Sequence, residues 1–413
     1  MRTTNDLRLG LLRQPGHVAF GPGQRAQLPS LVRRLGTSVL ICTDERMAGS
    51  EVFADIVKAL RGNGLTVSVF SAVEPELPRD NLLGLIEEFG GTDLDVVIGI
   101  GGGSCLDFAK IGAILLTRGG DVRDLYGEFQ VPGPGLPVIT VPTTGGTGAE
   151  VTCISVIHDP DLGMKVGVAS PYLEAHAAVV DPELTLTCPR GLTAATGADA
   201  LSHLIESFTA RAKNPGTDDI EQHLYVGKNV LTDVYARHGL ALLNTSLERL
   251  AEDLSDLGAR SDTMLGALSA GMAINTTGTA GAHAIQSPIG ALTHTAHGFG
   301  VGALLPYVMR YNLPAREPEF AEVADVLGVA DPGQSRASRA RAGIERVDAI
   351  LAALDVPPDL RELGLKPEQF DTVAEQALRA RRLTANNPRE LTKGSVLEIL
   401  ERGYHGDRGW WGE

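Results

Sequence analysis

The sequence predicts two domains, an N-terminal α/β domain built on a parallel β-sheet and a C-terminal domain made of helices. In the first half of the chain, continuous apolar runs alternate with stretches whose apolar residues recur at helical spacing. Strands that are apolar throughout are typical of a parallel sheet covered by helices on both faces. After residue 188 the strand signals thin out and helical stretches dominate, and a chain of 413 residues is long for a single core.

The predicted elements of the first half alternate in order along the chain. The strands are expected at residues 38–42, 66–70, 95–100 and 137–141, and the helices at 28–36, 50–60, 79–89 and 106–116. The second half is predicted to contain helices at residues 195–210, 220–235, 239–254, 260–274, 335–354, 369–381 and 393–401. Pro189 suits the first position of a helix, where its missing N–H is not needed. We therefore expect domains at residues 1–188 and 189–413.

Composition and charge exclude several classes of partner. The formal net charge is −15, whereas nucleic acids and anionic membranes attract basic patches. The N-terminus lacks the apolar core of a signal peptide, and no apolar run approaches the roughly 20 residues of a membrane span. The four cysteines are scattered without a CxxC pair, which favours free thiols. We expect a cytoplasmic protein with a small-molecule partner, and neither nucleic acid nor membrane.

Two glycine-rich loops follow predicted strands of the sheet. Residues 99–110, GIGGGSCLDFAK, open a helix directly after the third predicted strand, and residues 142–148, PTTGGTG, follow the fourth. Ligands of open α/β sheets bind at this edge, and a helix N-terminus offers unpaired N–H groups to a phosphate. Asp44 ends the first predicted strand, where a carboxylate can accept hydrogen bonds from ribose hydroxyls and would repel a 2′-phosphate. The alternatives are turns without a ligand and an Asp44 that only caps a helix.

A second group of residues has the spacing of metal ligands. Asp199 and His203 are four residues apart in an apolar helical stretch, so both lie on one face. His283, His294 and His297 fall within fifteen residues. One aspartate and two or three histidines suit Fe(II) or Zn(II). The alternative is an exposed Asp–His pair with unrelated histidines.

These motifs resemble the iron-containing (group III) alcohol dehydrogenase family over nearly the whole chain. The segments that carry the resemblance are GGGSCLDFAK at 101–110, PTTGGTGAEVT at 142–152, DPELTLTCP at 181–189, ADALSHLIES at 198–207, HGFGVGALLPYVMRYN at 297–312 and NPRELT at 387–392. The resemblance implies a Rossmann-like dinucleotide domain followed by a helical metal-binding domain, an architecture shared with dehydroquinate synthase. It also implies an active site between the domains. We expect a homodimer or a larger homo-oligomer.

The resemblance also assigns individual residues. The implied metal ligands for Fe(2+), with Zn(2+) as the alternative ion, are Asp199, His203, His283 and His297. The implied contacts to NAD(H) are Asp44, Gly102, Gly103, Ser104, Thr143, Thr144, Lys165, Leu184 and Cys188.

Three features depart from the family pattern. Ser287 stands where many members carry a further histidine, often assigned to proton transfer, so His294 becomes a candidate catalytic residue acting through Ser287 and water. Glu76 replaces a common cofactor-contacting asparagine. Residues 213–244 are longer than usual, which indicates a modified lid or oligomer contact.

The sequence therefore predicts a metal-dependent NAD(H) alcohol dehydrogenase or aldehyde reductase acting on a small alcohol or aldehyde, and polar or anionic substrates are within this prediction. The alternatives are an oxidoreductase similar to maleylacetate reductase or hydroxyacid-oxoacid transhydrogenase, a lyase similar to dehydroquinate synthase, and a non-catalytic binding protein. In the dehydrogenase, a bound metal would polarise the carbonyl, and the nicotinamide would carry the hydride.

Overall fold

The computed structural model describes residues 9–412, which divide into two compact units. One unit is Arg13–Cys188, and the other contains residues 9–12 together with 189–412. The N-terminal residues 9–12 thus lie with the helical unit, although the sequence prediction placed them in the first domain. Leu11 explains this position, because its N–H donates to Asn229 Oδ1 and its carbonyl accepts from Thr276 Oγ1. Each unit is described by itself below.

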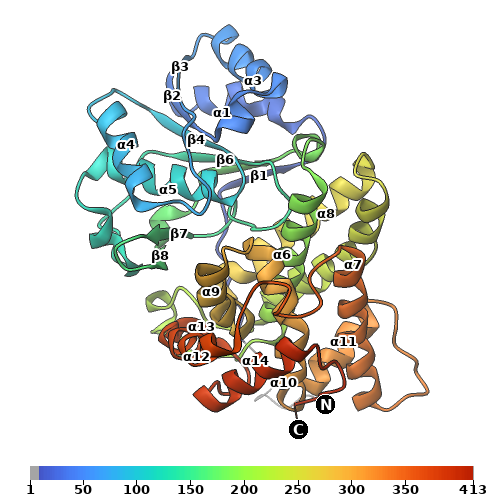
Figure 1. The fold of residues 1–413 in the computed structure, drawn as a ribbon. Coiled ribbons are helices and arrows are strands. Elements are labelled where there is room, and N and C mark those ends of the chain that lie inside the picture. Colours follow the sequence, from blue (N-terminus) through green and yellow to red (C-terminus); the bar gives the residue numbers. More distant parts are fainter. Residues whose placement is uncertain (1–8, 413) are drawn as a thin grey trace. The chain divides into compact units, whose positions relative to one another are not determined.

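The Arg13–Cys188 unit is built on a six-stranded parallel sheet with the order β1-β9-β6-β4-β2-β3 (Figure 1). The strands are β1 (His17–Phe20), β2 (Ser38–Cys42), β3 (Thr66–Phe70), β4 (Val96–Gly101), β6 (Val138–Pro142) and β9 (Ala177–Val180). The helices are α1 (Leu28–Arg33), α2 (Glu45–Ala48), α3 (Glu51–Gly62), α4 (Arg79–Phe89) and α5 (Gly103–Arg118). A second sheet contains β5 (Gly127–Glu128), β8 (Met164–Ala169) and β7 (Ile154–Asp159).

The apolar strands are buried on both faces of the large sheet. In β2, Val39 and Ile41 pack in a core with α1 and α3, whereas Leu40 and Cys42 pack in a second core with α4 and α5. This alternation explains why the strands are apolar at every position. From β2 the chain adds β3 on one side and β4 on the other, so the strand order reverses between β2 and β4. The carboxyl ends of these strands are where open α/β sheets bind ligands.

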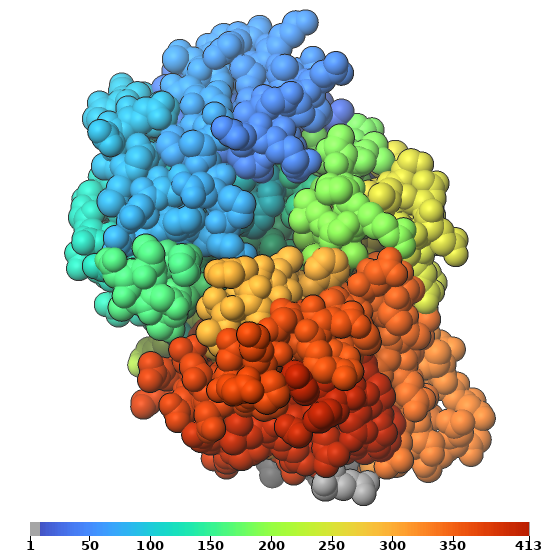
Figure 2. Space-filling model, viewed as in Figure 1, coloured from blue at the N-terminus to red at the C-terminus, as the bar shows by residue number. Residues whose placement is uncertain are grey.

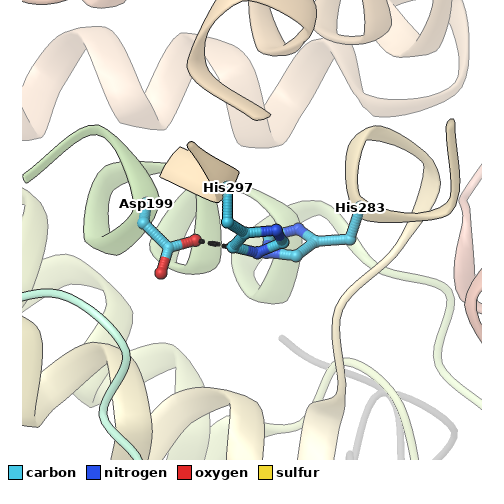
Figure 3. A group of neighbouring side chains, drawn as sticks. All are labelled: Asp199, His283 and His297. Atoms are coloured by element: carbon cyan, nitrogen blue, oxygen red, sulfur yellow. Dashed lines mark ion pairs between the residues drawn. The ribbon is translucent and has the colours of Figure 1, made fainter. Parts of the chain in front are cut away.

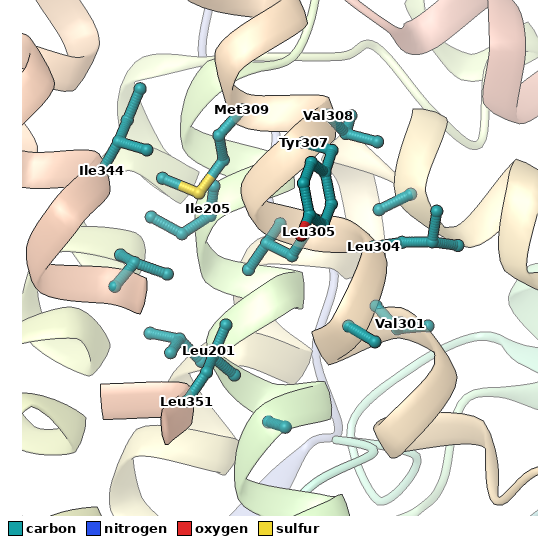
Figure 4. Packing of buried hydrophobic residues seen from close by; sticks show 14 of the residues in the cluster. Leu201, Ile205, Val301, Leu304, Leu305, Tyr307, Val308, Met309, Ile344 and Leu351 are labelled. Carbon is teal, nitrogen blue, oxygen red and sulfur yellow. The ribbon is translucent and has the colours of Figure 1, made fainter. Parts of the chain in front are cut away.

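The helical unit packs its helices around one apolar core. The helices are α6 (Arg190–Thr209), α7 (Val230–Glu252), α8 (Leu257–Thr277), α9 (Gly281–Thr293), α10 (His297–Val326), α11 (Arg336–Ala353), α12 (Phe370–Arg379), α13 (Arg381–Asn386) and α14 (Lys393–His405). Side chains of α6, α10 and α11 interlock in this core, as Ile205, Met309 and Ile344 illustrate (Figure 4). On the face seen in Figure 2, the C-terminal segments of this unit, in orange and red, form one continuous surface. No helix among the described residues is long and apolar enough to span a membrane.

Two predicted helix boundaries in this unit are wrong. The stretch predicted as a helix at 220–235 contains only a short 3₁₀ turn, Ile220–Gln222, before α7 begins at Val230. Gly227, at φ 70°, forms an isolated antiparallel bridge with Ala212, so the chain is not helical there. Asn229 then caps α7 by accepting from the N–H groups of Leu231 and Thr232. The helix predicted to begin at Gly239 begins earlier, at Val230, and Gly239 lies inside α7 against Leu204.

The β7–β8 hairpin is fixed by a buried carboxylate. Asp159 accepts hydrogen bonds from Arg123 Nε at 2.9 Å and Tyr126 Oη at 2.8 Å, and its Oδ1 accepts from the N–H groups of Asp161 and Leu162 in the turn. The hydrogen bond from Arg123 is the main reason that the pKa of Asp159 lies well below its ordinary value. This hairpin carries Lys165, so its position affects the predicted cofactor residues.

We predict that Asp159→Asn lowers the melting temperature at pH 7, because the ionised carboxylate is the form that the folded hairpin stabilises. A depressed pKa stabilises the fold above the unfolded pKa of about 3.9, and this stabilisation is lost as the pH falls through the folded pKa. The melting-temperature difference between wild type and variant, measured by calorimetry, should therefore shrink below about pH 4. Asp161→Asn, at the exposed end of the same network, should have a smaller effect. A difference that does not change with pH would contradict this account.

Candidate functional site: two glycine-rich loops and an Asp–His cluster

The two glycine-rich loops of the Arg13–Cys188 unit lie side by side at the carboxyl edge of the sheet. The Thr143 N–H donates to the Gly101 carbonyl at 2.9 Å. Gly101 has a φ of 151°, and a Cβ there would lie 2.4 Å from Cys105 Sγ, so the turn into α5 admits only glycine. Gly102 is the N-cap of α5 and offers no side chain to the first N–H groups of the helix. These donors and the partial positive charge of the helix are suited to an anion such as a pyrophosphate.

Asp44 lies next to this helix N-terminus. Its Oδ1 caps α2 by accepting from the Met47 N–H at 2.8 Å, and its Oδ2 accepts from Cys105 Sγ at 3.6 Å. The capping alternative considered for Asp44 is therefore observed. It leaves Asp44 half-buried beside α5, and a carboxylate at this place would oppose a second phosphate on a nucleotide ribose.

The other residues predicted to contact the cofactor have different surroundings. Cys188 Sγ donates to the Thr143 carbonyl at 3.1 Å, so the cysteine holds the second loop in place. Leu184 is buried in the apolar core beside the sheet. Thr143 is fully buried, and its Oγ1 has no hydrogen-bond partner among the described residues, whereas Thr144 is buried with 9% of its surface exposed.

Glu76 joins two of the predicted cofactor residues. Its backbone N–H donates to Ser104 Oγ at 3.1 Å, and its carboxylate forms an ion pair with Lys165 Nζ on β8. Glu76 and Leu77 both have positive φ angles, 66° and 50°, which are uncommon for residues other than glycine. The glutamate that departs from the family pattern is thus held at the edge of the first loop.

Asp107 and Lys110 of the GGGSCLDFAK segment serve the fold. Lys110 is buried, and its Nζ lies 2.9 Å from Asp107 Oδ1 and donates to the carbonyls of Thr152 and Ile154. Asp107 Oδ2 accepts from the Val156 N–H. This buried pair fastens α5 to β7 and thereby fixes the direction in which the N-terminus of α5 points.

In the helical unit, four predicted metal ligands come together from three helices. Asp199 and His203 lie on α6, His283 is the third residue of α9, and His297 is the first residue of α10. Asp199 Oδ1 lies 3.5 Å from Nε2 of each of the three histidines. Figure 3 shows Asp199, His283 and His297 pointing toward one another. The rings of His203 and His283 are stacked, with centroids 4.7 Å apart.

Glycines of the HGFGVG segment allow this convergence. A Cβ on Gly298 would lie 1.8 Å from the Ala195 carbonyl of α6, so only glycine permits α10 to begin so close to α6. Gly302, one turn later, faces Ala198 in the same way at 3.0 Å. The close contact between α10 and α6 brings His297 next to Asp199.

Asp199, His283 and His297 fit a divalent cation, since their ligand atoms all lie within 4.8 Å of one another. Two ligands bound at about 2.1 Å in tetrahedral geometry are about 3.4 Å apart, close to the 3.5 Å observed. Asp199 and His283 are buried, and Asp199 Oδ1 and His283 Nε2 have no hydrogen-bond partner among the described residues. Such buried atoms cost free energy unless a partner binds them. His297 is the most exposed of the four, with 34% of its side chain accessible, which gives the cluster an open side.

Glu206 contacts the cluster, and the sequence reasoning missed it. It lies on α6, and its Oε2 is 2.6 Å from His283 Nδ1. The Glu206 carboxylate also accepts from the N–H groups of Ala280 and Ala282 at the beginning of α9. The signal was present in the sequence, because residues 199, 203 and 206 recur at helical spacing and share a face within an apolar stretch.

The two carboxylates control the protonation of the cluster. Burial lowers the pKa of His283, but the charges of Glu206 and Asp199 and the contact with Glu206 outweigh it and raise the pKa to about 9. Burial disfavours the charged form of Asp199, yet His203 and His297 hold its pKa below the ordinary value. The cluster therefore carries two buried negative charges that call for positive charge beside them.

Ser287 and His294, the candidate proton-transfer residues, lie further along α9. Ser287 is one turn after His283 and is half-buried. His294 is the exposed C-cap of α9, with a left-handed φ of 55°. Ser287, four residues after His283, lies on the same face of α9 as His283, whereas His294 caps the helix outside its regular geometry.

Comparison with known protein families identifies the chain. The family model described as iron-containing alcohol dehydrogenase matches residues 15–182, and the C-terminal model of the same family matches residues 219–404. The chain belongs to the iron-containing alcohol dehydrogenase family. The resemblance read from the sequence and the prediction of an oxidoreductase of the alcohol dehydrogenase type are confirmed.

Three curated relatives of this family member cover nearly the whole chain. Long-chain-alcohol dehydrogenase 1 of Geobacillus thermodenitrificans is 33% identical over 94% of this chain and 95% of its own length. NAD-dependent methanol dehydrogenase of Bacillus methanolicus is 29% identical, with 94% and 98% covered. Sulfoacetaldehyde reductase of Bilophila wadsworthia is 31% identical, with 94% and 97% covered. The names differ in substrate, so the family alone does not decide which alcohol or aldehyde is used.

Solved structures of iron-containing alcohol dehydrogenase relatives share the fold. A 1,3-propanediol oxidoreductase matches with a TM-score of 0.90 and 29% identity, covering 96% of this chain and all of its own. An alcohol dehydrogenase from Oenococcus oeni matches with a TM-score of 0.89 and 30% identity over the same shares. The predicted fold class, a Rossmann-like α/β domain followed by a helical domain, is confirmed.

Proposed function

We propose that the protein is an NAD(H)-linked alcohol dehydrogenase and aldehyde reductase that uses a divalent metal, Fe(2+) in the first place, held by Asp199, His203, His283 and His297. The observation that carries this proposal is the meeting of three imidazole Nε2 atoms at one buried carboxylate oxygen. One aspartate and three histidines suit Fe(2+) and also Zn(2+). Substrates are proposed to be small alcohols or aldehydes, including polar or anionic ones.

The chemistry divides between the metal, the cofactor and the chain. A bound divalent ion supplies Lewis acidity, which makes an alcohol proton easier to remove and a carbonyl carbon easier to attack. The nicotinamide carries the hydride. The chain orients both reactants: the N-terminus of α5 and the loop at Thr143 and Thr144 would bind the pyrophosphate, and Asp44 would bind the adenosine ribose.

Lys165 and Glu76 are proposed to act together at the cofactor. Because their ion pair lies beside Ser104, the lysine would meet the cofactor as part of a neutral pair and not as a lone cation. Leu184 and Cys188 would support the cofactor-binding loops from the protein interior. Leu184 lies in the core beside the sheet, and Cys188 donates a hydrogen bond to the Thr143 carbonyl.

We further propose a cytoplasmic location and a homodimer or larger homo-oligomer. All four cysteines are buried as free thiols, which is in keeping with a reducing compartment. Val230, Leu231 and Val234 are exposed apolar residues at the beginning of α7, within the segment that is longer than usual in the family. Light scattering of the purified protein measures the oligomeric state.

The first functional prediction concerns the metal. His283→Ala and Asp199→Ala should each abolish NADH-linked aldehyde reduction and lower bound iron or zinc well below one ion per chain, because each removes one ligand atom. Metal content by mass spectrometry and turnover should be measured on the same preparations. His405→Ala, which changes an exposed histidine on α14, is the matched control. Full activity in a metal-free preparation would exclude the metal-dependent function.

The second prediction concerns the choice between NAD(H) and NADP(H). Wild type should prefer NADH in kcat/KM, because Asp44 would meet the 2′-phosphate of NADPH as a like charge. Asp44→Asn removes the charge while keeping an oxygen to cap α2, so it should reduce the preference without unfolding the loop. Asp44→Gly, which also loses the cap, should reduce the preference further or reverse it. A wild type that prefers NADPH would refute the assignment.

The third prediction concerns the proton path. We propose that His294, acting through Ser287 and water, relays the alcohol proton in place of the missing family histidine. His294→Ala should then lower kcat by roughly 10²–10⁴-fold and change its pH profile, as expected for general acid–base catalysis. Ser287→Ala should give a smaller loss of the same kind. Metal content must be checked, so that ligand loss is not mistaken for relay loss. An unchanged kcat and pH profile with metal retained would leave His294 as a helix cap only.

A further inference from the structure

We propose that Glu206 is a positioning residue of the metal site, which fixes the tautomer and direction of the His283 ring so that Nε2 faces Asp199. This inference rests on the proposed metal-dependent function. Glu206 lies seven residues after Asp199 on α6, and 3% of its surface is exposed. Residues 199, 203 and 206 therefore present two prospective ligands and one supporting carboxylate on a single helical face.

The hydrogen bonds of Glu206 decide the tautomer. Its Oε1 accepts from the Ala282 N–H at 2.6 Å, and its Oε2 accepts from the Ala280 N–H at 2.8 Å. Backbone N–H groups can only donate, so the Glu206 oxygens are acceptors. The third contact, 2.6 Å from Oε2 to His283 Nδ1, is therefore a hydrogen bond donated by Nδ1. A neutral imidazole that carries its proton on Nδ1 has its free lone pair on Nε2, the atom 3.5 Å from Asp199 Oδ1.

Glu206 also holds the helix on which His283 lies. Its two backbone hydrogen bonds satisfy N–H groups at the beginning of α9, and a negative charge is favourable at a helix N-terminus. Ring orientation and backbone position are thus set by one side chain. Hydrogen-bond acceptors at the non-ligating ring nitrogen orient metal-binding histidines and raise their basicity. Losing such an acceptor commonly weakens metal binding by about 10- to 100-fold.

Asn386 provides a comparison that separates ring orientation from loop rigidity. Its Nδ2 donates to the carbonyls of Thr277, Gly278 and Thr279, immediately before α9. Asn386 therefore binds the carbonyl groups of the backbone before α9. Glu206 binds the N–H groups of the backbone at the beginning of α9. The described hydrogen bonds of Asn386 Nδ2 go to this loop backbone, whereas those of Glu206 include His283.

The test measures metal affinity in full-length protein by competition with a chelator, using Zn(2+) and Co(2+) as probes. In Glu206→Gln, the side-chain NH₂ group cannot accept a hydrogen bond, yet it must face at least one of the three N–H groups that the carboxylate binds. The support of the His283 ring is weakened, so the metal Kd should rise by about 10- to 100-fold. The visible absorption of bound Co(2+) should also change, since the orientation of one ligand ring changes. Glu206→Asp keeps the charge on a shorter side chain and should give an intermediate Kd, which serves as the test if Glu206→Gln does not fold.

The control is Asn386→Ala, which should lower the melting temperature while leaving the metal Kd and the Co(2+) spectrum close to wild type. If Asn386→Ala and Glu206→Gln weaken metal binding equally, loop rigidity is responsible and the positioning role is overturned. If wild type binds one metal per chain and both Glu206 variants bind it equally well, only this inference fails. A wild type that binds no metal would remove the proposed function and this inference together.

Discussion

The structure of the helical unit depends on the placing of two carboxylates, Asp199 and Glu206, inside an apolar helix bundle. Each is almost fully buried, and the ion pairs described for them are with histidines. Buried charges are costly unless opposite charge and hydrogen bonds accompany them. With neutral imidazoles as ligands, a divalent cation would balance the two negative charges. The charges of the cluster would therefore be balanced when a divalent metal ion binds.

Several features of the surrounding helices follow from this requirement. Helix α6 must be buried along nearly its whole length, because it carries both carboxylates and His203. The beginnings of α9 and α10 must approach α6 closely, and Gly298 makes this possible at α10. In the Arg13–Cys188 unit, backbone geometry has the corresponding role, since a turn that admits only glycine leads into α5 and its first N–H groups have no side-chain cap.

The sequence predicted the features that depend on short-range periodicity. The four predicted strands are found as β2, β3, β4 and β6, and the spacing of Asp199 and His203 correctly indicated a shared helical face. Residue types and spacing suggested a site of one aspartate and two or three histidines. The choice of His283 and His297 as ligands beside Asp199 came from the family resemblance, because sequence spacing contains no information on how separate helices pack. Features that depend on tertiary contacts were missed, including Glu206 and the buried Lys110–Asp107 clamp. The helix predicted at 220–235 was wrong, since the bridge at Gly227 overrides local propensity.

The central claim is that Asp199, His203, His283 and His297 bind one divalent metal ion. Anomalous diffraction at the iron absorption edge, from crystals of protein reconstituted with Fe(2+) without oxygen, tests it most directly. The account predicts one strong peak at about 2.0–2.2 Å from Asp199 Oδ1 and from Nε2 of each histidine. A reconstituted protein with no peak at this cluster, or with its iron bound elsewhere, would contradict the account.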